Sequence, residues 1–238
     1  MELSFVQCNL NHCSAAQDLI AQYMVEEKVD IALLSDPYGV GTDPCAWLAS
    51  AGSRRAAIYI ASNNVTIANV IRDREFISAV STECRYTAAP NQALEDFSDL
   101  LHRLEASFRS VEQGVPVLIT GDFNARSSAW GDWISNSRGD ELSLMLDSLD
   151  LVIANSGSTP TFARGAGSII DLTLASESLA RRVGNWRVLD FVFNFSDHHY
   201  IRFTLSPITQ NPPPHHQPPH AGGTLPAELM QKLSAQVC

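Results

Sequence analysis

The sequence lacks the cysteine patterns of disulfide-bonded and zinc-binding proteins. Its five cysteines are odd in number, form no Cys-x-x-Cys pair and have no histidine at zinc-finger spacing. Reduced cysteines are typical of proteins inside the cell. The N-terminal segment also has no basic region followed by a small-residue cleavage site, which a secretory signal would have. We therefore expect an intracellular protein.

Long hydrophobic runs and glycine-rich loops are also missing. The apolar runs are far shorter than the roughly 20 residues that a membrane-spanning helix needs. Neither Gly-x-Gly-x-x-Gly nor Gly-x-x-x-x-Gly-Lys-Ser/Thr occurs, so the phosphate-binding loops of dinucleotide-binding proteins and P-loop enzymes are absent from the sequence. We therefore predict no membrane contact and no nucleotide cofactor.

Positive charge is scarce. The formal net charge is −10, and the only lysines are Lys28 and Lys232. Because affinity for nucleic-acid phosphates comes mainly from lysine and arginine, this balance argues against passive binding of nucleic acid. It does not exclude a metal-dependent nuclease, whose active site concentrates carboxylates around a cation that supplies local positive charge.

What is present indicates one α/β domain over residues 1–206. Hydrophobic residues make up 45% of the chain, which allows a sizeable core. The turn SNN is predicted to join two neighbouring strands. Irregular alternation of strands and helices favours two mixed β-sheets packed face to face and flanked by helices. Apolar periodicity predicts strands at 3–8, 30–34, 56–61, 65–71, 115–120, 150–154, 168–175, 186–193 and 199–205, and helices at 14–28, 91–112 and 140–148.

The composition changes after Ser206. Residues 207–224 are rich in proline and histidine and are unsuited to a packed core, so we interpret them as a linker. Metal binding by its histidines is an alternative, but a solvated linker is the simpler interpretation. Residues 225–238 have helical periodicity and no partner in this chain, which indicates a truncated helical tail.

Short polar clusters stand at the ends of the apolar strands. Taken singly, an acid in a loop is usually a turn residue, and a lone histidine is more often structural than catalytic. Together, acids, amides and a histidine are what metal-assisted phosphoryl transfer needs, because oxygen ligands hold Mg²⁺ and a carboxylate orients water. The residues concerned are Asn9, Asp36, Asp122, Asn124, Asp171, Asp197 and His198.

These motifs resemble the endonuclease/exonuclease/phosphatase superfamily, which includes pancreatic deoxyribonuclease and the apurinic/apyrimidinic endonucleases. The segments GDFNARSSAWG, SNSRGDEL, LDLVIANSGSTPTF, SIIDLTLAS and SDHHYIRF are similar to the endonuclease domain of insect-type non-LTR retrotransposons. The resemblance extends from about Leu3 to Leu205. It implies a deoxyribonuclease-like four-layer α/β sandwich, a Mg²⁺ or Mn²⁺ cofactor, double-stranded DNA as the substrate, and action on chromosomal DNA in the nucleus.

The resemblance also implies which residues hold the metal and activate the attacking water. Asn9, Asp36 and Asp197 match positions at or beside the metal. Asp122 matches the residue that positions or deprotonates the nucleophilic water. These assignments give the carboxylates of the strand ends distinct roles.

Further matches concern the phosphate. Asn124 and His198 match groups that contact it, and Tyr86 matches a tyrosine that donates a hydrogen bond to it. Asp171 matches the carboxylate that orients the histidine, since a carboxylate fixes the tautomer of an imidazole and raises its basicity.

Two departures from the family pattern favour a decayed copy. Asp36 replaces the glutamate expected at the metal, so its carboxylate is one methylene shorter, and Mg²⁺ tolerates little error in its ligand geometry. The segment around residues 77–90 is also short and suggests a missing central strand, which would expose backbone groups of its neighbours.

Candidate DNA contacts follow the GDFN motif. We select Arg126, Trp130 and Arg138 because loops at strand ends probe the backbone and the minor groove of DNA in this fold. Trp133 lies in the same region. Packing of Trp130 at the domain edge is the alternative interpretation.

Three functions therefore stay open. The first is an endonuclease that nicks target DNA for retrotransposon insertion. The second is another phosphoesterase of the superfamily, such as an abasic-site nuclease, a ribonuclease or a sugar or lipid phosphatase. The third is a catalytically decayed retrotransposon fragment, which the acidic charge, Asp36 and the short 77–90 region favour.

Overall fold

The computed structural model describes residues 1–81, 84–92, 94–110 and 114–207. These belong to one compact unit, Met1–Pro207. Of the predicted linker, 207–224, only Pro207 is described, and the predicted helical tail, 225–238, lies outside the described residues. None of the helices in the described ranges has the length and apolar character needed to cross a membrane.

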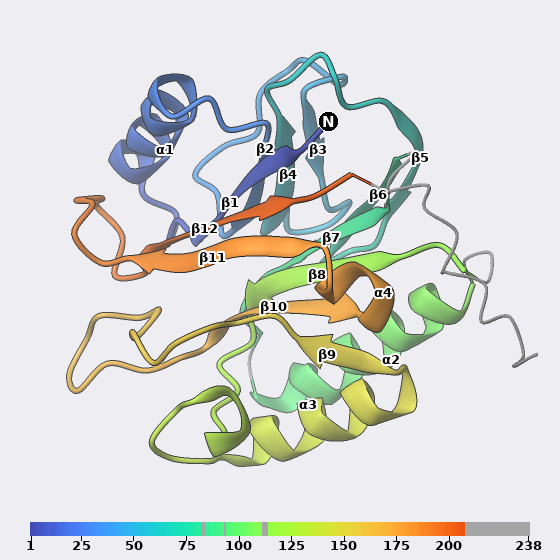
Figure 1. Cartoon of the computed structure of the whole chain (residues 1–238), viewed down its shortest axis with the longest axis vertical. Coiled ribbons are helices and arrows are strands. Elements are labelled where there is room, and N and C mark those ends of the chain that lie inside the picture. The colour runs from blue at the N-terminus through green and yellow to red at the C-terminus, as the bar shows by residue number, and fades with distance from the viewer. Residues whose placement is uncertain (82–83, 93, 111–113, 208–238) are drawn as a thin grey trace, which may run out of the picture. The chain divides into compact units, whose positions relative to one another are not determined.

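Half of the strands form a mixed six-stranded sheet with the order β11-β12-β1-β2-β4-β3. β1 and β2 are parallel, and the other neighbours are antiparallel. Parallel β1 and β2 therefore end at the same edge of the sheet (Figure 1). The strands are β1 (Leu3–Asn9), β2 (Ile31–Ser35), β3 (Trp47–Ala49), β4 (Ala56–Ile60), β11 (Val183–Leu189) and β12 (Tyr200–Leu205).

The second sheet also has six strands, in the order β5-β6-β7-β8-β10-β9. β7 and β8 are parallel, and the remaining pairs are antiparallel. Asp122 at the end of β8 is therefore opposite Asp171 at the start of β10. The strands are β5 (Ile67–Arg72), β6 (Ile77–Ser81), β7 (Arg85–Ala89), β8 (Val117–Asp122), β9 (Leu151–Ile153) and β10 (Asp171–Ser176).

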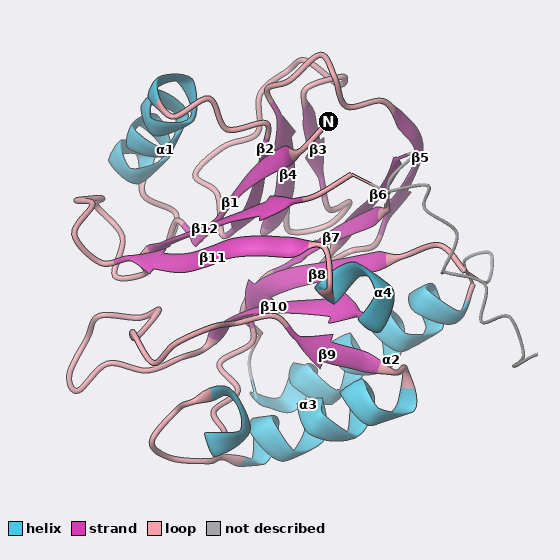
Figure 2. Cartoon of the chain, in the orientation of Figure 1, coloured by secondary structure: helices cyan, strands magenta, loops and turns pink. Residues whose placement is uncertain are grey.

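Helices cover the outer face of each sheet (Figure 2). Alternate residues of a strand face opposite sides, so Phe5 of β1 packs between the sheets while Val6 packs against α1. Leu142 of α3 and Phe97 of α2 share a second outer core with β8 and β10. The predicted four-layer α/β sandwich is thus confirmed. The helices are α1 (Ser14–Glu26), α2 (Leu94–Arg109), α3 (Ser137–Ser148), α4 (Glu177–Ala180) and the 3₁₀ helix η1 (Ser128–Trp130).

The short 77–90 segment has not lost a strand, which corrects the sequence-based expectation. β6 and β7 pair over four positions, from Ile77 opposite Ala88 to Val80 opposite Arg85. β7 also pairs with β8 along its length. The segment retains both strands because Ile77 and Ala88 each contribute to the buried core between the sheets.

The predicted turn SNN does not join a hairpin. β4 pairs with β2 and β3 in the first sheet, whereas β5 pairs with β6 in the second. The chain therefore crosses from one sheet to the other after Ala61. Apolar alternation identified both strands, but it carries no information about which sheet each one joins.

Candidate active site

Side chains from both sheets meet in one cavity of about 490 Å³. Asn9 ends β1, Asp36 follows β2, and Asp122 ends β8. Asn9 Nδ2 donates a 2.9 Å hydrogen bond to Asp122 Oδ2, which links the two sheets at this edge. Six of the predicted catalytic and metal-binding residues line the cavity: Asn9, Asp36, Asp122, Asn124, Asp197 and His198.

Asp171 and His198 form a buried carboxylate–imidazole pair at the wall of this cavity. His198 Nδ1 lies 2.8 Å from Asp171 Oδ2, and its Nε2 lies 3.8 Å from Asp122 Oδ2. Burial alone would lower the pKa of His198, but the charges of Asp171 and Asp122 and the hydrogen bond to Asp171 outweigh burial and raise it to about 9. The raised pKa favours the cationic form of His198 at neutral pH.

Asp122 occupies the centre of the arrangement. Its Oδ1 accepts a 3.0 Å hydrogen bond from the backbone N–H of Asn124, and its Oδ2 accepts one from Asn9. Burial, followed by the charge of Asp171, raises the pKa of Asp122 to about 7, although His198 acts in the opposite direction. A carboxylate with this pKa is suited to accept a proton near neutral pH.

Gly121 permits this placement of Asp122. A Cβ atom at Gly121 would lie 2.3 Å from the backbone oxygen of Ala89 on the neighbouring strand β7. Only glycine allows β7 and β8 to approach so closely at the point where the GDFN motif begins.

Asp36 is fixed to the cavity wall by a guanidinium group. Arg55 donates to both of its carboxylate oxygens, through Nε at 2.6 Å and Nη2 at 3.2 Å. The backbone of Asp36 has a left-handed conformation with φ of 44°, and its N–H donates to the backbone oxygen of Arg55. His12 Nε2 lies 3.5 Å from Asp36 Oδ1. The shorter carboxylate is therefore oriented by contacts with two neighbouring segments.

Asp197 is the third residue of the cavity that offers an oxygen atom as a possible metal ligand, beside Asn9 and Asp36. It forms a 2.6 Å ion pair with Arg164 and lies 3.5 Å from Asn11 Nδ2. Asn9, Asp36 and Asp197 line the same cavity and offer amide and carboxylate oxygens. Such oxygens are the ligands that Mg²⁺ prefers, so the donor set suits a hard divalent cation.

Asp122, Asp171 and His198 form a separate, closely spaced group that differs from the possible metal ligands. One ligand atom from each of Asp122, Asp171 and His198 lies within 4.8 Å of the others, and all three residues are buried. Because His198 and Asp171 are hydrogen-bonded directly to each other, this group is arranged to hold and transfer protons rather than to enclose a metal ion.

Tyr86 lies away from the cavity. Its ring is fully buried between the sheets, 5.4 Å from the ring of Phe5. Its hydroxyl oxygen lies 3.2 Å from Ser81 Oγ. Tyr86 was predicted to contact a phosphate, but its side chain faces the core and does not line the cavity.

The three predicted DNA contacts have different environments. Arg126 lines the cavity and is paired with the buried Asp132. Trp130 is buried and donates to the backbone oxygen of Ile169, which agrees with packing rather than with DNA contact. Arg138 is also buried, where it donates to backbone oxygens and lies over the ring of Phe97. Only Arg126 has the exposure that a DNA contact requires.

Sequence reasoning missed six polar residues of the cavity, which are Asn11, His12, Arg55, Asn91, Arg164 and Ser168. Arg55 and Arg164 come from loops without a recognisable motif, and Asn11 and His12 form a short left-handed turn after β1. The signal for that turn is the Asn-x-Asn-His sequence, because asparagine and histidine adopt positive φ more readily than most residues.

A family model described as endonuclease-reverse transcriptase matches residues 77–202. No curated protein matches the chain significantly. Among solved structures, the endonuclease domain of TRAS1, a telomere-specific non-LTR retrotransposon, is 23% identical with a TM-score of 0.78, and the match covers 88% of this chain and 100% of that chain.

Two DNA-processing proteins are more distant structural neighbours. An AP endonuclease from Archaeoglobus fulgidus is 16% identical with a TM-score of 0.65, covering 85% of this chain and 99% of that chain. The 3′ phosphatase NExo from Neisseria, bound to a product DNA hairpin, is 16% identical with a TM-score of 0.64, covering 86% of this chain and 99% of that chain. At these identities the likeness establishes the shared fold.

Proposed function

Because the chain belongs to the endonuclease-reverse transcriptase family, we propose that it is a Mg²⁺-dependent endonuclease that nicks double-stranded DNA for retrotransposon insertion. Its site of action would be chromosomal DNA in the nucleus. The observation that carries the proposal is the buried Asp171–His198 pair beside Asp122, in the cavity that also holds the oxygen donors.

In the proposed reaction, water attacks the phosphorus atom of the scissile phosphodiester. Asp122 orients this water and accepts its proton, which its pKa near 7 permits at neutral pH. His198, held as a cation by Asp171, donates Nε2–H to a non-bridging phosphate oxygen. Asn124, whose side chain lines the cavity, positions the same phosphate. The phosphorus–oxygen bond to the leaving strand end breaks, and that oxygen takes up a proton.

Asn9, Asp36 and Asp197 would hold the divalent cation. When bound, Mg²⁺ would supply positive charge beside the phosphate and stabilise the charge that develops on it. Arg55 already neutralises Asp36, and Arg164 neutralises Asp197, so both carboxylates are held in place before a cation arrives. Mn²⁺, which also prefers oxygen ligands, would occupy the same site.

A substrate panel tests the proposal. The purified chain is incubated with Mg²⁺ or Mn²⁺ and with supercoiled plasmid, an abasic duplex, RNA or a phosphoinositide. We expect plasmid nicking, with a loss of about 10² to 10⁴-fold in Asp122→Asn because proton transfer to a positioned base is removed. The exposed substitution Val25→Ala on α1 is the matched control.

The panel also separates the alternatives. Preferential cleavage of the abasic duplex, RNA or phosphoinositide would assign the chain to another phosphoesterase activity of the superfamily. Absence of hydrolysis from every substrate, also after Asp36→Glu restores the longer carboxylate, would identify a decayed copy. The intact Asp171–His198 pair and the retained strands β6 and β7 support the active enzyme.

A further inference from the structure

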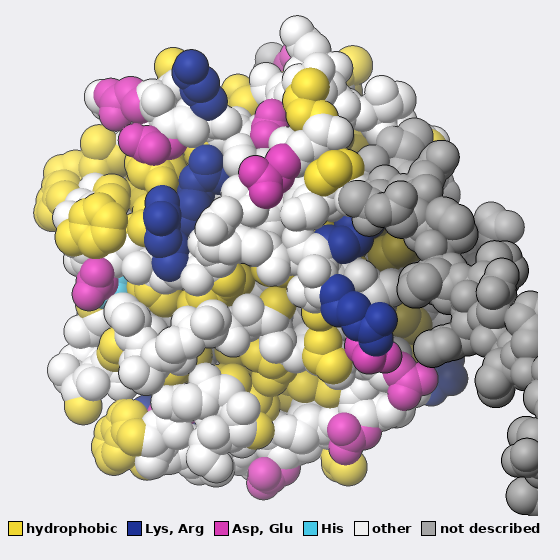
Figure 3. All heavy atoms as spheres, viewed as in Figure 1, with side chains coloured by type: hydrophobic (Ala, Val, Ile, Leu, Met, Phe, Trp, Pro, Cys, Tyr) yellow, Lys and Arg dark blue, Asp and Glu magenta, His cyan; other side chains and the backbone are white. Residues whose placement is uncertain are grey.

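The loop between β11 and β12 presents three phenylalanines to solvent. Phe191, Phe193 and Phe195 are 78%, 71% and 57% exposed, whereas a phenylalanine is normally among the most buried residues. Figure 3 shows a hydrophobic group at this edge of the molecule. Clustered exposed apolar side chains mark contact sites on a soluble domain.

The loop is built to hold these rings outward. Val192 packs against the core beneath α1, and Asn194 is buried. Asn194 Nδ2 donates to the backbone oxygen of His198 at 3.0 Å, and its Oδ1 accepts from the N–H of Ser196 at 3.1 Å. Since the side chains of alternate residues are anchored inside, the three phenylalanines face away from the fold.

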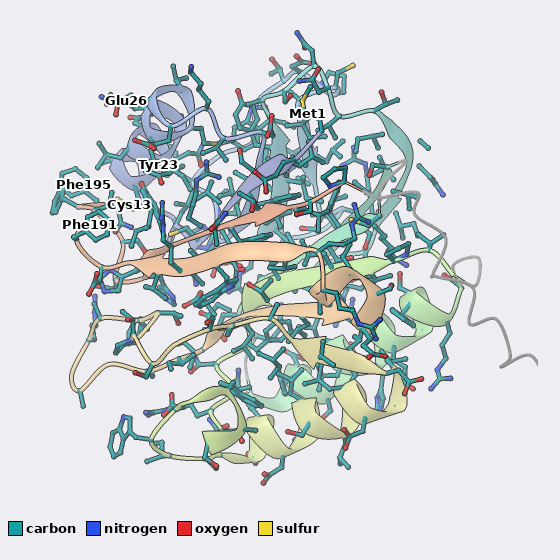
Figure 4. The ribbon with its side chains drawn as sticks, viewed as in Figure 1. Met1, Cys13, Tyr23, Glu26, Phe191 and Phe195 are labelled. Atoms are coloured by element: carbon teal, nitrogen blue, oxygen red, sulfur yellow. The ribbon has the colours of Figure 1, made fainter. Side chains whose placement is uncertain are left out.

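The same loop continues directly into the proposed active site. Ser196 Oγ donates to the backbone oxygen of Asn9 at 2.6 Å, and the next two residues, Asp197 and His198, line the cavity. Figure 4 shows Phe191 and Phe195 projecting from the outer end of this loop. The rings of Phe193 and Phe195 meet edge to face with centroids 4.9 Å apart. The aromatic group is therefore fixed relative to the catalytic side chains.

We propose that Phe191, Phe193 and Phe195 contact bases of the bound DNA beside the scissile phosphate, entering between base pairs or stacking on an unstacked base. This inference rests on the proposed function, because it takes DNA as the molecule in the cavity. Apolar side chains inserted between base steps unstack and kink a duplex, and aromatic rings stack on any base. The rings lack hydrogen-bonding groups, so the contact adds affinity without reading the sequence.

The surroundings favour nucleic acid as the occupant over a second protein surface. Arg187, four residues before Phe191, is exposed on β11, and Arg126 and Arg164 line the adjoining cavity. Guanidinium groups in the cavity suit a phosphate, and exposed aromatic rings on the loop that leads to the cavity suit the bases carried by the same backbone. Phe195 is only three residues before His198 in the chain, so the rings belong to the loop that leads directly into the proposed phosphate site.

The test measures equilibrium binding of a fluorescent duplex at several salt concentrations, in EDTA, alongside plasmid nicking with Mg²⁺. We expect Phe193→Ala/Phe195→Ala to weaken DNA binding about tenfold or more at every salt concentration. The slope of the logarithm of the binding constant against the logarithm of the salt concentration should not change. Arg126→Ala is expected to reduce the steepness of this salt dependence instead, by about the amount that one phosphate contact contributes. Phe193→Trp/Phe195→Trp should bind as the wild type does, and the exposed Leu144→Ala on α3 is the matched apolar control.

Each outcome decides the inference. Wild-type binding without nicking would reject the proposed function, while the phenylalanine variant would still test the base contact. Equal binding by wild type and the Phe193→Ala/Phe195→Ala variant would overturn the inference even if the wild type nicks DNA. Failure of the wild type both to bind DNA in EDTA and to nick it with Mg²⁺ would overturn both. Sedimentation that shows a dimer lost in the variant, with unchanged DNA affinity, would assign the rings to self-association and also overturn the inference.

Discussion

At the scale of single residues, the carboxylate of Asp171 controls the charge of His198. Asp171 is buried and accepts from His198 Nδ1, and its charge and this hydrogen bond, together with the charges of Asp122 and Asp197, outweigh the effect of burial on the imidazole. The folded-state pKa of His198, about 9, therefore lies above the value of about 6.5 expected in the unfolded chain. Proton binding to His198 thus favours the folded state.

This linkage predicts a pH-dependent stability in metal-free buffer. The contribution from His198 is complete below about pH 6.5 and is lost as the pH rises to about 9, a change of about 3 kcal/mol. Asp171→Asn removes the charge and should flatten this dependence. Urea unfolding of both proteins at pH 8.0, 8.75 and 9.5 measures it, at least about one pH unit above the Asp122 pKa of about 7. If the free energy of unfolding changed with pH in the same way in both proteins, the proposed control of the His198 charge by Asp171 would be contradicted.

Asp36 carries a second prediction at this scale. Its oxygens line the cavity with those of Asn9 and Asp197, so Asp36→Ala should weaken Mn²⁺ binding by at least about tenfold in isothermal titration. Asp36→Glu should strengthen binding, because one more methylene extends the carboxylate further into the cavity. Asp18→Ala, which removes an exposed acid on α1, should leave the affinity unchanged. Equal affinities in all three variants would place the cation elsewhere.

The sequence identified several polar residues, directly beside apolar strands, that the structure brings together in one cavity. Asn9, Asp122 and His198 are recognisable because they belong to a set of polar clusters beside apolar strands that together offer acids, amides and an imidazole. Arg55 carried no such signal, since its role depends on β4 lying antiparallel to β2, and pairing of that kind is a property of the whole sheet. Tyr86 was misjudged because its hydrogen-bonding group lies in the core beside Ser81.

At the scale of elements, the close approach of β7 and β8 determines where the GDFN motif lies. Gly121→Ala would bring a Cβ atom to 2.3 Å from the backbone oxygen of Ala89, and a backbone atom in a paired strand cannot move away cheaply. We expect a loss of about 1–3 kcal/mol in the free energy of unfolding, measured by urea denaturation. Gly39→Ala is the control, because it would meet no atom within 4 Å. Equal stability of the two variants would contradict the proposed constraint on β8.

Strand boundaries were predictable only where apolar residues are buried. The pattern WRVLDFVF predicts a strand to residue 193, but β11 ends at Leu189, and Phe191 and Phe193 are exposed in the following loop. Periodicity presumes that hydrophobic side chains face a core. The predicted end of the strand is therefore wrong in a segment where apolar residues are exposed to solvent, and these residues form the proposed base contact.

At the scale of the whole molecule, two mixed sheets bring distant segments together at one edge. Each sheet contains one parallel pair, β1 with β2 and β7 with β8, so three of the site residues leave their strands in neighbouring positions. Periodicity and strand-end chemistry predicted two facing sheets with outer helices. They did not predict that the chain crosses between the sheets after β4, because local sequence does not encode pairing partners.

The acidic net charge is also explained at this scale. The chain carries a formal charge of −10, yet the cavity that holds its buried acids is lined by Arg55, Arg126 and Arg164. The basic side chains are thus placed where a phosphate would enter. Away from this cavity, the acidic surface of the protein would bind DNA weakly, because non-specific affinity for DNA depends on dispersed positive charge.

Relaxation of supercoiled plasmid by the wild type and by His198→Ala, with Mg²⁺ or with EDTA, tests the central claim most directly. We predict that the wild type makes single-strand nicks in Mg²⁺ and none in EDTA, and that His198→Ala nicks about 10² to 10³-fold more slowly. Nicking by His198→Ala at the wild-type rate, or wild-type nicking that persists in EDTA, would contradict it.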